Sequence, residues 1–137
     1  MFLLDTNIIS ELRKPKPHGG VVAWAHAYPA EQYNVPAIAI YELQSGAELV
    51  RKQNAAKARE IDLWIELIMT THHVVPFEQQ AARVTAWVMQ GQPQELFEDA
   101  MIAATAIANG LTVATRNTRD FGYFNVPLVN PFLFPRS

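Results

Sequence analysis

Short apolar runs alternate with helix-like segments along the whole chain, and this alternation limits the possible folds more than any other feature. The runs at residues 2–4, 33–37, 74–75, 111–115 and 126–129 are typical of strands, with Pro36 tolerated near the end of its strand. Strands that alternate with helices are joined by right-handed crossovers and form a parallel sheet covered on both faces. The sequence therefore predicts an α/β fold.

The intervals between these runs have helical spacing. Helices are expected over residues 7–13, 21–27, 78–90 and 97–108, and Asn109-Gly110 ends the last of them in a C-cap pattern. Two further helices are predicted from apolar residues that recur at helical intervals: Ile40, Leu43, Ala47 and Val50, and then Ile61, Trp64, Ile65 and Ile68. Residues 92–96 are expected to form a loop.

The composition fits one folded domain over residues 1–137. Half of the 137 residues are hydrophobic, 18% are charged and the net charge is −2, so a nucleic-acid contact would depend on local basic patches. The absence of cysteine excludes disulfides and thiolate metal sites. Asp5 interrupts the first apolar run, which argues against a signal peptide, and no apolar run approaches the roughly 20 residues of a membrane span. A cytoplasmic location is expected.

Four acids stand near the predicted strand ends. Asp5 ends the first strand, Glu42 follows the second, and Asp99 begins the helix that leads to the fourth. Asp120 follows the fourth strand in the segment TRNTRDF. Parallel sheets bind ligands beyond the carboxyl ends of their strands, so all four acids could share one edge. Clustered carboxylates repel one another unless a cation lies between them, and oxygen ligands without His or Cys favour Mg²⁺ or Mn²⁺.

Each acid also has an interpretation that needs no ligand. Asp5 and Asp99 could cap the helices that follow them, because Asp is a common cap and the helix dipole favours a carboxylate there. Glu42 could be a solvated helix residue, and Asp120 a turn residue. Glu98 could either join the site or face water. The recurrence of acids near several strand ends favours the shared site.

Aromatic and histidine side chains have simpler expected roles. Tyr41 and Phe97 could stack on a base, although burial is the expected outcome. His72 and His73 are adjacent in a strand and would point to opposite faces, so a structural role is expected rather than zinc binding. The three tryptophans occupy apolar helical positions and are expected in the core or in a dimer contact: Trp24, Trp64 and Trp87.

Four segments of the chain resemble the PIN-domain ribonucleases, and most closely the VapC or FitB-like toxins of bacterial toxin–antitoxin pairs: LLDTNIIS, AIAIYELQSG, DAMIAATAIANGLTVATRN and DF. They occur in the family's order and spacing and span nearly the whole chain. The resemblance implies a PIN-like three-layer α/β/α sandwich with a five-stranded parallel sheet, a homodimer, and Mg²⁺- or Mn²⁺-dependent cleavage of RNA.

The resemblance also implies roles for particular residues. Asp5, Glu42 and Asp99 match the family's catalytic and metal-binding acids. The fourth acidic position falls at Asn117 or Asp120, and Asp120 is preferred because only it is acidic. Supporting polar roles are implied for the side chains around these acids: Thr6, Asn7, Thr115 and Asn117.

Basic residues are the candidates for gripping RNA. Arg116 and Arg119 are preferred because they flank the exit of the fourth strand beside the proposed site, where phosphate contacts would position RNA without reading its sequence. Arg13 and two nearby lysines follow the first helix. The basic cluster within residues 51–59 is interpreted as a solvated face.

A cognate antitoxin of the VapB or FitA type is implied as well, with a C-terminal segment that covers the cleft. An arginine from that segment would pair bidentately with the acids. Three alternatives remain at this point. The chain could be a PIN-domain RNA-processing nuclease without a toxin role, or a non-catalytic interaction module whose acids are caps. It could also be a phosphatase-like domain with Asp5 as nucleophile, which would require a second acid where the chain has Asn7.

Overall fold

A five-stranded parallel sheet forms the centre of the computed structural model, which describes residues 1–136. The strand order is β3-β2-β1-β4-β5, and Phe2 aligns with Tyr33 on one side and with Thr112 on the other. The strands are β1 (Phe2–Leu4), β2 (Tyr33–Pro36), β3 (His73–Val75), β4 (Thr112–Ala114) and β5 (Leu128–Val129). Four of them match the predicted runs to within one residue at each end, and β5 covers only the second half of the run predicted at 126–129.

Seven α-helices surround the sheet within residues 1–136: α1 (Thr6–Arg13), α2 (Gly19–Ala27), α3 (Ala37–Arg51), α4 (Ala55–Thr71), α5 (Gln79–Val88), α6 (Phe97–Asn109) and α7 (Thr118–Phe121). Short 3₁₀ turns are η1 (Ala30–Gln32), η2 (Gln94–Leu96), η3 (Gly122–Phe124) and η4 (Pro131–Leu133). Two predictions were wrong in detail, because η2 lies inside the expected loop and Ala37 begins a helix rather than ending a strand. None of these helices has the length and apolarity needed to cross a bilayer.

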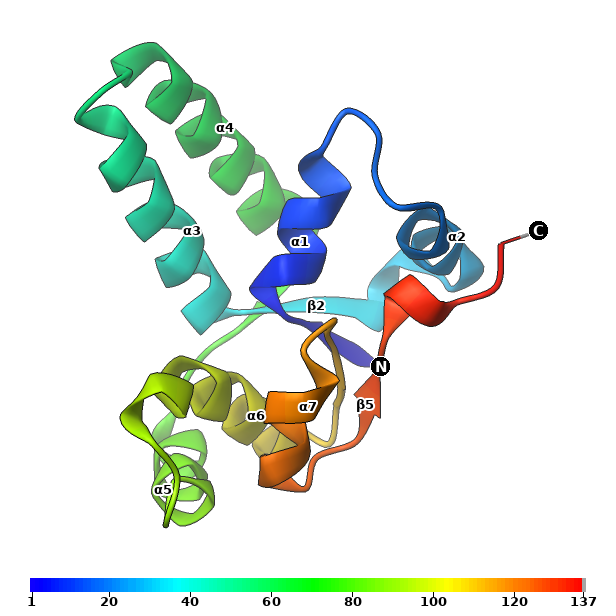
Figure 1. The fold of residues 1–137 in the computed structure, drawn as a ribbon, viewed down its shortest axis with the longest axis vertical. Helices are drawn as coiled ribbons and strands as arrows, with labels where there is room; N and C mark the ends of the chain where they lie inside the picture. Colours follow the sequence, from blue (N-terminus) through cyan, green and yellow to red (C-terminus); the bar gives the residue numbers. More distant parts are fainter. Residues whose placement is uncertain (137) are drawn as a thin grey trace.

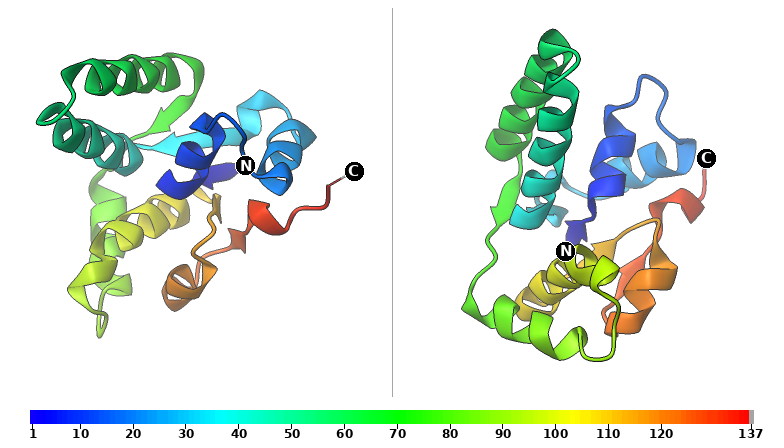
Figure 2. Two further views of the ribbon diagram at one scale, coloured as in Figure 1. Left: turned by 45° about the horizontal axis from the view of Figure 1, so that its top comes forward. Right: turned by 60° about the vertical axis from the view of Figure 1, so that its left-hand side comes forward.

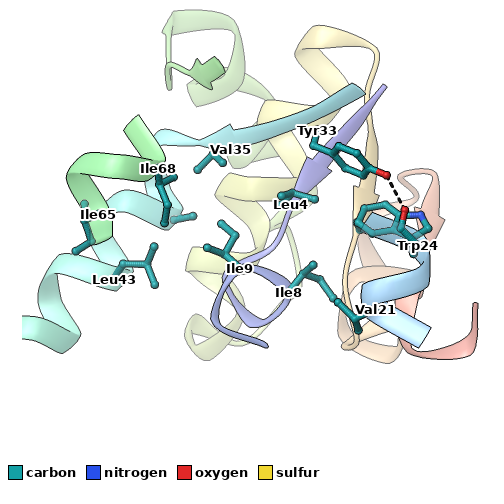
Figure 3. Packing of buried hydrophobic residues seen from close by; sticks show 12 residues of the cluster. Leu4, Ile8, Ile9, Val21, Trp24, Tyr33, Val35, Leu43, Ile65 and Ile68 are labelled. Carbon is teal, nitrogen blue, oxygen red and sulfur yellow. Dashed lines mark hydrogen bonds between the residues drawn. The ribbon is translucent and has the colours of Figure 1, made fainter. Parts of the chain in front are cut away.

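One hydrophobic core lies between the sheet and helices α1–α4 (Figures 1 and 3). Leu4 and Val35 project from the sheet into this core, where Ile8 of α1 and the fully buried Trp24 of α2 pack against them. The Tyr33 hydroxyl donates a 2.6 Å hydrogen bond to the backbone carbonyl of Trp24, which ties β2 to α2. This core holds α1, and therefore the acid that begins it, firmly on the sheet.

A second core covers the opposite face, under α5, α6 and α7. Leu3 and Val113 belong to it, while their neighbours Leu4 and Ala114 belong to the first core, as the two-residue alternation of a strand requires. Figure 2 shows the α3–α4 hairpin extending beyond the sheet on one side and the α5–α6 pair on the other. The two cores confirm the three-layer α/β/α architecture.

Helix α6 is placed by its small residues and by its end. Five of its apolar residues are essentially inaccessible to solvent, and four of them are alanines, which allow the helix to approach the sheet closely: Ala100, Ile102, Ala103, Ala104 and Ala106. Gly110 adopts a left-handed conformation with φ of 65° and ends the helix. Because α6 leads directly into β4, it returns along the sheet, and its acidic N-terminus lies over the carboxyl ends of the strands.

Candidate active site

Asp5 lies at the centre of the site, immediately after the central strand β1. Its buried carboxylate accepts a 2.7 Å hydrogen bond from the backbone N–H of Thr6 and a 3.0 Å bond from Asn7 Nδ2. The Thr115 hydroxyl donates to the same carboxylate at 2.7 Å. Burial raises the pKa of Asp5, while these three hydrogen bonds act to lower it. Asp5 therefore caps α1, as one interpretation expected, and also faces the end of the neighbouring strand β4.

Asn117 connects this centre to two further acids. Its backbone N–H donates to Thr115 Oγ1 at 2.9 Å, and its side-chain Nδ2 lies 3.3 Å from Asp99 Oδ2 and 3.0 Å from Asp120 Oδ2. The chain of contacts runs from Asp5 through Thr115 and Asn117 to both acids. The Asn117 amide thus joins Asp99 to Asp120, and of the two candidates for the fourth acidic position only Asp120 carries a carboxylate. Asp120 lies in α7 rather than in the turn that was the alternative interpretation.

Asp99 is held in the first turn of α6. The residue at the N-cap is Leu96, which provides no side-chain hydrogen bond, so the prediction that Asp99 could cap this helix was wrong. The pKa of Asp99 is raised to about 6, first by burial and then by the negative charges of Asp5 and Asp120. The contribution of these charges is the repulsion expected of carboxylates that share one site.

Glu42 approaches from the first turns of α3. Its half-buried carboxylate accepts a 2.7 Å hydrogen bond from the Thr6 hydroxyl, so it is not the freely solvated helix residue of the alternative interpretation. The pKa of Glu42 is raised to about 7, mainly by burial and also by the carboxylates of Glu98 and Asp5, whereas the hydrogen bond from Thr6 acts to lower it. Glu98, whose position the sequence left open, therefore lies beside Glu42 at the edge of the site. The only signal for it in the sequence was its place next to Asp99.

Within the described residues, the acids of the site form no ion pair with a basic side chain. The three ion pairs formed within residues 1–136 are Lys14–Glu11, Arg51–Glu48 and Arg51–Asp62, and none of them includes a site acid. In the same range no three acidic or histidine side chains are already gathered closely enough to hold one ion. Mg²⁺ is commonly bound by only one or two carboxylates, with water in the other positions. An unbalanced set of carboxylate oxygens with two central aspartates fits such an ion.

Two exposed arginines flank the acids, as predicted. The guanidinium of Arg116 lies over the Phe132 ring at 4.5 Å, and its backbone N–H donates to Asn7 Oδ1 at 3.3 Å. Arg119 is exposed on α7. By contrast, Arg51 is occupied by ion pairs with Glu48 and Asp62 on the surface, which agrees with the solvated-face interpretation of its cluster.

The aromatic predictions were partly wrong. Tyr41 and Phe97 are 60% and 40% exposed, so the expectation of burial failed for both. Each of these aromatic residues directly precedes an acid near the site. Helical periodicity alone did not show which face of each helix would be packed against the rest of the protein. Trp24 is core, as predicted, and Trp64 packs against the same core, partly buried under the guanidinium of Arg13. Trp87 is 53% exposed, so a dimer contact stays the prediction for it.

The model of the PIN-domain family matches residues 2–124, a range that contains all of the acids described above. The chain belongs to the PIN-domain family. Among solved structures, this chain is similar to the FitAcB crystal structure from Neisseria gonorrhoeae, with a TM-score of 0.86 and 34% sequence identity. That alignment covers 98% of this chain and all of the other.

Curated relatives align over almost the same length. Toxin FitB of Neisseria gonorrhoeae is 34% identical over 139 residues, which cover 96% of the PIN domain chain and 99% of the relative. VapC ribonuclease Y4jK of Sinorhizobium fredii is 36% identical over 140 residues, which cover 96% and 98%. The resemblance drawn from the sequence motifs is confirmed.

Proposed function

We propose that this chain, as one PIN domain over residues 1–137, is a metal-dependent endoribonuclease and the toxin of a toxin–antitoxin pair. The observation that carries the proposal is the hydrogen-bonded chain from Asp5 through Thr115 and Asn117 to Asp99 and Asp120. None of these carboxylates forms an ion pair within residues 1–136. The names of its relatives, a toxin and a VapC ribonuclease, support the same activity.

A Mg²⁺ or Mn²⁺ ion would be held by Asp5 and Asp99, with Glu42 and Asp120 in reach directly or through water. When bound, it would supply a water of lowered pKa and stabilise negative charge that develops on the phosphoryl oxygens. The donor set favours these hard cations because all of its members are oxygen ligands. The residues present therefore fit the Mg²⁺ or Mn²⁺ ion that the resemblance to the family implies.

The chain's own residues orient the acids. Thr115 and Asn7 donate to Oδ2 of Asp5, whereas the Thr6 N–H donates to Oδ1. The side chain of Asn117 contacts both Asp99 and Asp120 and so fixes the distance between them. Thr6 donates to Oε1 of Glu42, which leaves Oε2 as the oxygen able to exchange a proton. Since the pKa of Glu42 is raised to about 7, that exchange would occur near neutral pH.

The RNA backbone would be gripped by Arg116 and Arg119. Both are exposed next to the acids and form no ion pair within residues 1–136. Arginine binds phosphate through its planar fork, and such contacts position RNA without reading its sequence. Activity on RNA would place the protein in the cytoplasm.

The proposed partners are an antitoxin and a second copy of the chain. A solved relative is a complex of FitA and FitB, so we assign this chain a VapB- or FitA-like antitoxin whose C-terminal segment covers the acids with an arginine. Exposed apolar side chains on α4 and α5, Leu63, Leu67 and Trp87, support a homodimer. Sedimentation of the purified chain would test the dimer. A small DNA-binding protein encoded in the neighbouring reading frame would distinguish a toxin from an RNA-processing nuclease.

The activity is tested with purified protein and a fluorescent single-stranded RNA. Cleavage should need Mg²⁺ or Mn²⁺, stop with EDTA, and fall at least about 100-fold in Asp5→Asn, which retains the shape of the side chain. Asp62→Asn is the matched control, because Asp62 is paired with Arg51 outside the site. A folded wild-type protein without metal-dependent cleavage would favour a non-catalytic interaction module, and release of phosphate from monoesters would favour a phosphatase.

A further inference from the structure

A groove of about 320 Å³ lies between α1 and the α3–α4 hairpin, which stand side by side in Figure 1. Thr6 and Glu42 line one end of it, and Arg13 and Trp64 line the other, with Gly46 between them. The volume falls within the range of small-ligand pockets, about 300–1,000 Å³. The groove is therefore large enough to hold one planar group of nucleotide size.

The groove opens directly onto the acids of the site. Thr6 Oγ1 donates to Glu42 Oε1 at 2.7 Å, so the residues that close this end are the pair that links α1 to α3 beside Asp5. The backbone N–H of Thr6 donates to Asp5 Oδ1 at 2.7 Å, so this one residue contacts both carboxylates. A ligand in the groove would adjoin a phosphodiester placed at the acids.

The far end of the groove carries a positive charge. The guanidinium of Arg13 lies 5.2 Å from the centre of the Trp64 ring, which holds it over the aromatic face. Arg13 is exposed, and no ion pair within residues 1–136 includes it. The Arg13 guanidinium can therefore contact a phosphate, whereas the Arg51 guanidinium is already occupied by ion pairs with Glu48 and Asp62.

Gly46 keeps the middle of the groove open. It lies inside α3, where glycine is less stable than alanine, and it has no positive φ that would require glycine. A Cβ atom built at Gly46 would meet no atom within 4 Å. Packing within the described chain thus gives no reason for a glycine here, whereas a ligand in the groove would.

We propose that this groove binds one nucleotide of the RNA, adjacent to the bond that is cleaved. The base lies over Gly46, between the apolar walls of α3 and α4, and the guanidinium of Arg13 contacts the phosphate beyond it. The charge pattern favours RNA. The acids at one end would lie at the phosphate that is cleaved, and the guanidinium of Arg13 at the other end would contact the phosphate of the adjacent nucleotide. This inference rests on the proposed ribonuclease function and names a substrate contact for it.

The first test fills the groove with Gly46→Met, and Gly46→Ala serves as the smaller change. Because the space is empty and glycine is a poor helix former, both variants should unfold at urea concentrations no lower than the wild type. KM for a long single-stranded RNA should rise about ten-fold in Gly46→Met and less in Gly46→Ala, with kcat changed less than about two-fold, since base contacts of this kind contribute about 1–3 kcal/mol.

Shortened RNAs show where the contact lies. Two oligonucleotides are compared, one truncated on each side of the cleaved bond. For one of them the KM of Gly46→Met should equal that of the wild type, because the nucleotide that would occupy the groove is missing. The other should still show the increase.

A second test uses salt dependence, which a purely structural role of Arg13 would not alter. Arg13→Gln should reduce the slope of log KM against log salt concentration by about one, and Arg13→Lys should keep the slope. Arg59→Gln is the matched control, because Arg59 is exposed on α4 and does not line the groove.

Three outcomes overturn the inference. If Gly46→Met cleaves every RNA with the wild-type KM, no nucleotide occupies the groove, although the nuclease itself stands. If Gly46→Met leaves RNA cleavage intact and weakens only binding of the antitoxin, the groove is a protein-docking site. If Arg13→Gln keeps the wild-type salt slope, the assigned phosphate contact is wrong. Failure of the wild type to cleave RNA at all would instead refute the proposed function.

Discussion

Replacing Asp99 with asparagine should stabilise the metal-free protein. The carboxylate of Asp99 is half buried, and burial together with Asp5 and Asp120 raises its pKa from 3.8 to about 6. Asparagine has the same shape, carries no charge, and retains an oxygen that can accept the hydrogen bond from Asn117 Nδ2. The variant therefore removes repulsion while leaving the local contacts in place.

The expected gain follows from the pKa difference. A shift from 3.8 to about 6 corresponds to about 3 kcal/mol, and screening by solvent at a half-exposed site reduces this to about 1 kcal/mol. The folded pKa is the higher one, so the folded protein binds more protons than the unfolded chain between pH 4 and 6. The charged carboxylate thus lowers stability progressively as pH rises through this window, and by its full amount above it.

Urea unfolding followed by tryptophan fluorescence measures the effect in EDTA. At pH 8 the free energy of unfolding of Asp99→Asn should exceed that of the wild type by about 1 kcal/mol, and at pH 3.5 the two should agree. Addition of Mg²⁺ should stabilise the wild type more than the variant, because only the wild type retains both central carboxylates.

Asp62→Asn provides a control of opposite sign. Hydrogen bonds from Gln44 and Arg51 lower the pKa of Asp62, so its charge stabilises the folded state at pH 8 and its loss should destabilise. An Asp99→Asn variant that is no more stable than the wild type at pH 8, or that shows the same gain at pH 3.5, would contradict charge repulsion at the site.

Three further predictions concern the site and the helix that carries it. Thr115→Val removes the hydroxyl that donates to Asp5 and accepts from Asn117 N–H, so unfolding in urea should show a loss of about 2 kcal/mol, and RNA cleavage should fall in parallel. Cleavage at low Mg²⁺ should rise between pH 5.5 and 8 as Glu42 and Asp99 lose their protons; the midpoint should move to lower pH at higher Mg²⁺, and a midpoint independent of metal concentration would contradict this. Gly110→Ala should lower thermal stability by about 1 kcal/mol with unchanged kcat, because φ is 65° at this position and an alanine is strained there. Calorimetry measures the unfolding midpoint, and an unchanged midpoint would show that no such strain exists.

The strands, and the positions of the acids relative to them, could be predicted from the sequence because both depend on local signals. A three-residue apolar run followed by an acid, as in FLLD, indicates a short strand that ends just before the acid, and Asp5 directly follows β1 in the structure. Pro36 marked the end of β2, and it is also the N-cap of α3, which begins at Ala37. Proline suits this position because it has no N–H to donate.

Features that depend on distant parts of the chain were not predictable in the same way. The exposure of Tyr41 and Phe97 depends on which neighbouring helices cover α3 and α6, and periodicity does not contain that information. The contact of Glu98 with Glu42 joins two helices more than fifty residues apart in sequence. The short helix α7 has only four residues, too few for a periodic pattern to show.

The central position of β1 in the sheet has a consequence for synthesis. Strand β1 is synthesised before both of its neighbours, β2 and the much later β4, so it cannot be paired on both sides until residues 112–114 have been made. The carboxylate of Asp5 accepts its hydrogen bond from Thr115, 110 residues later in the chain, only after that residue has been synthesised. A nascent or truncated chain that ends before Thr115 therefore lacks the assembled acids, so it would not yet be a competent enzyme.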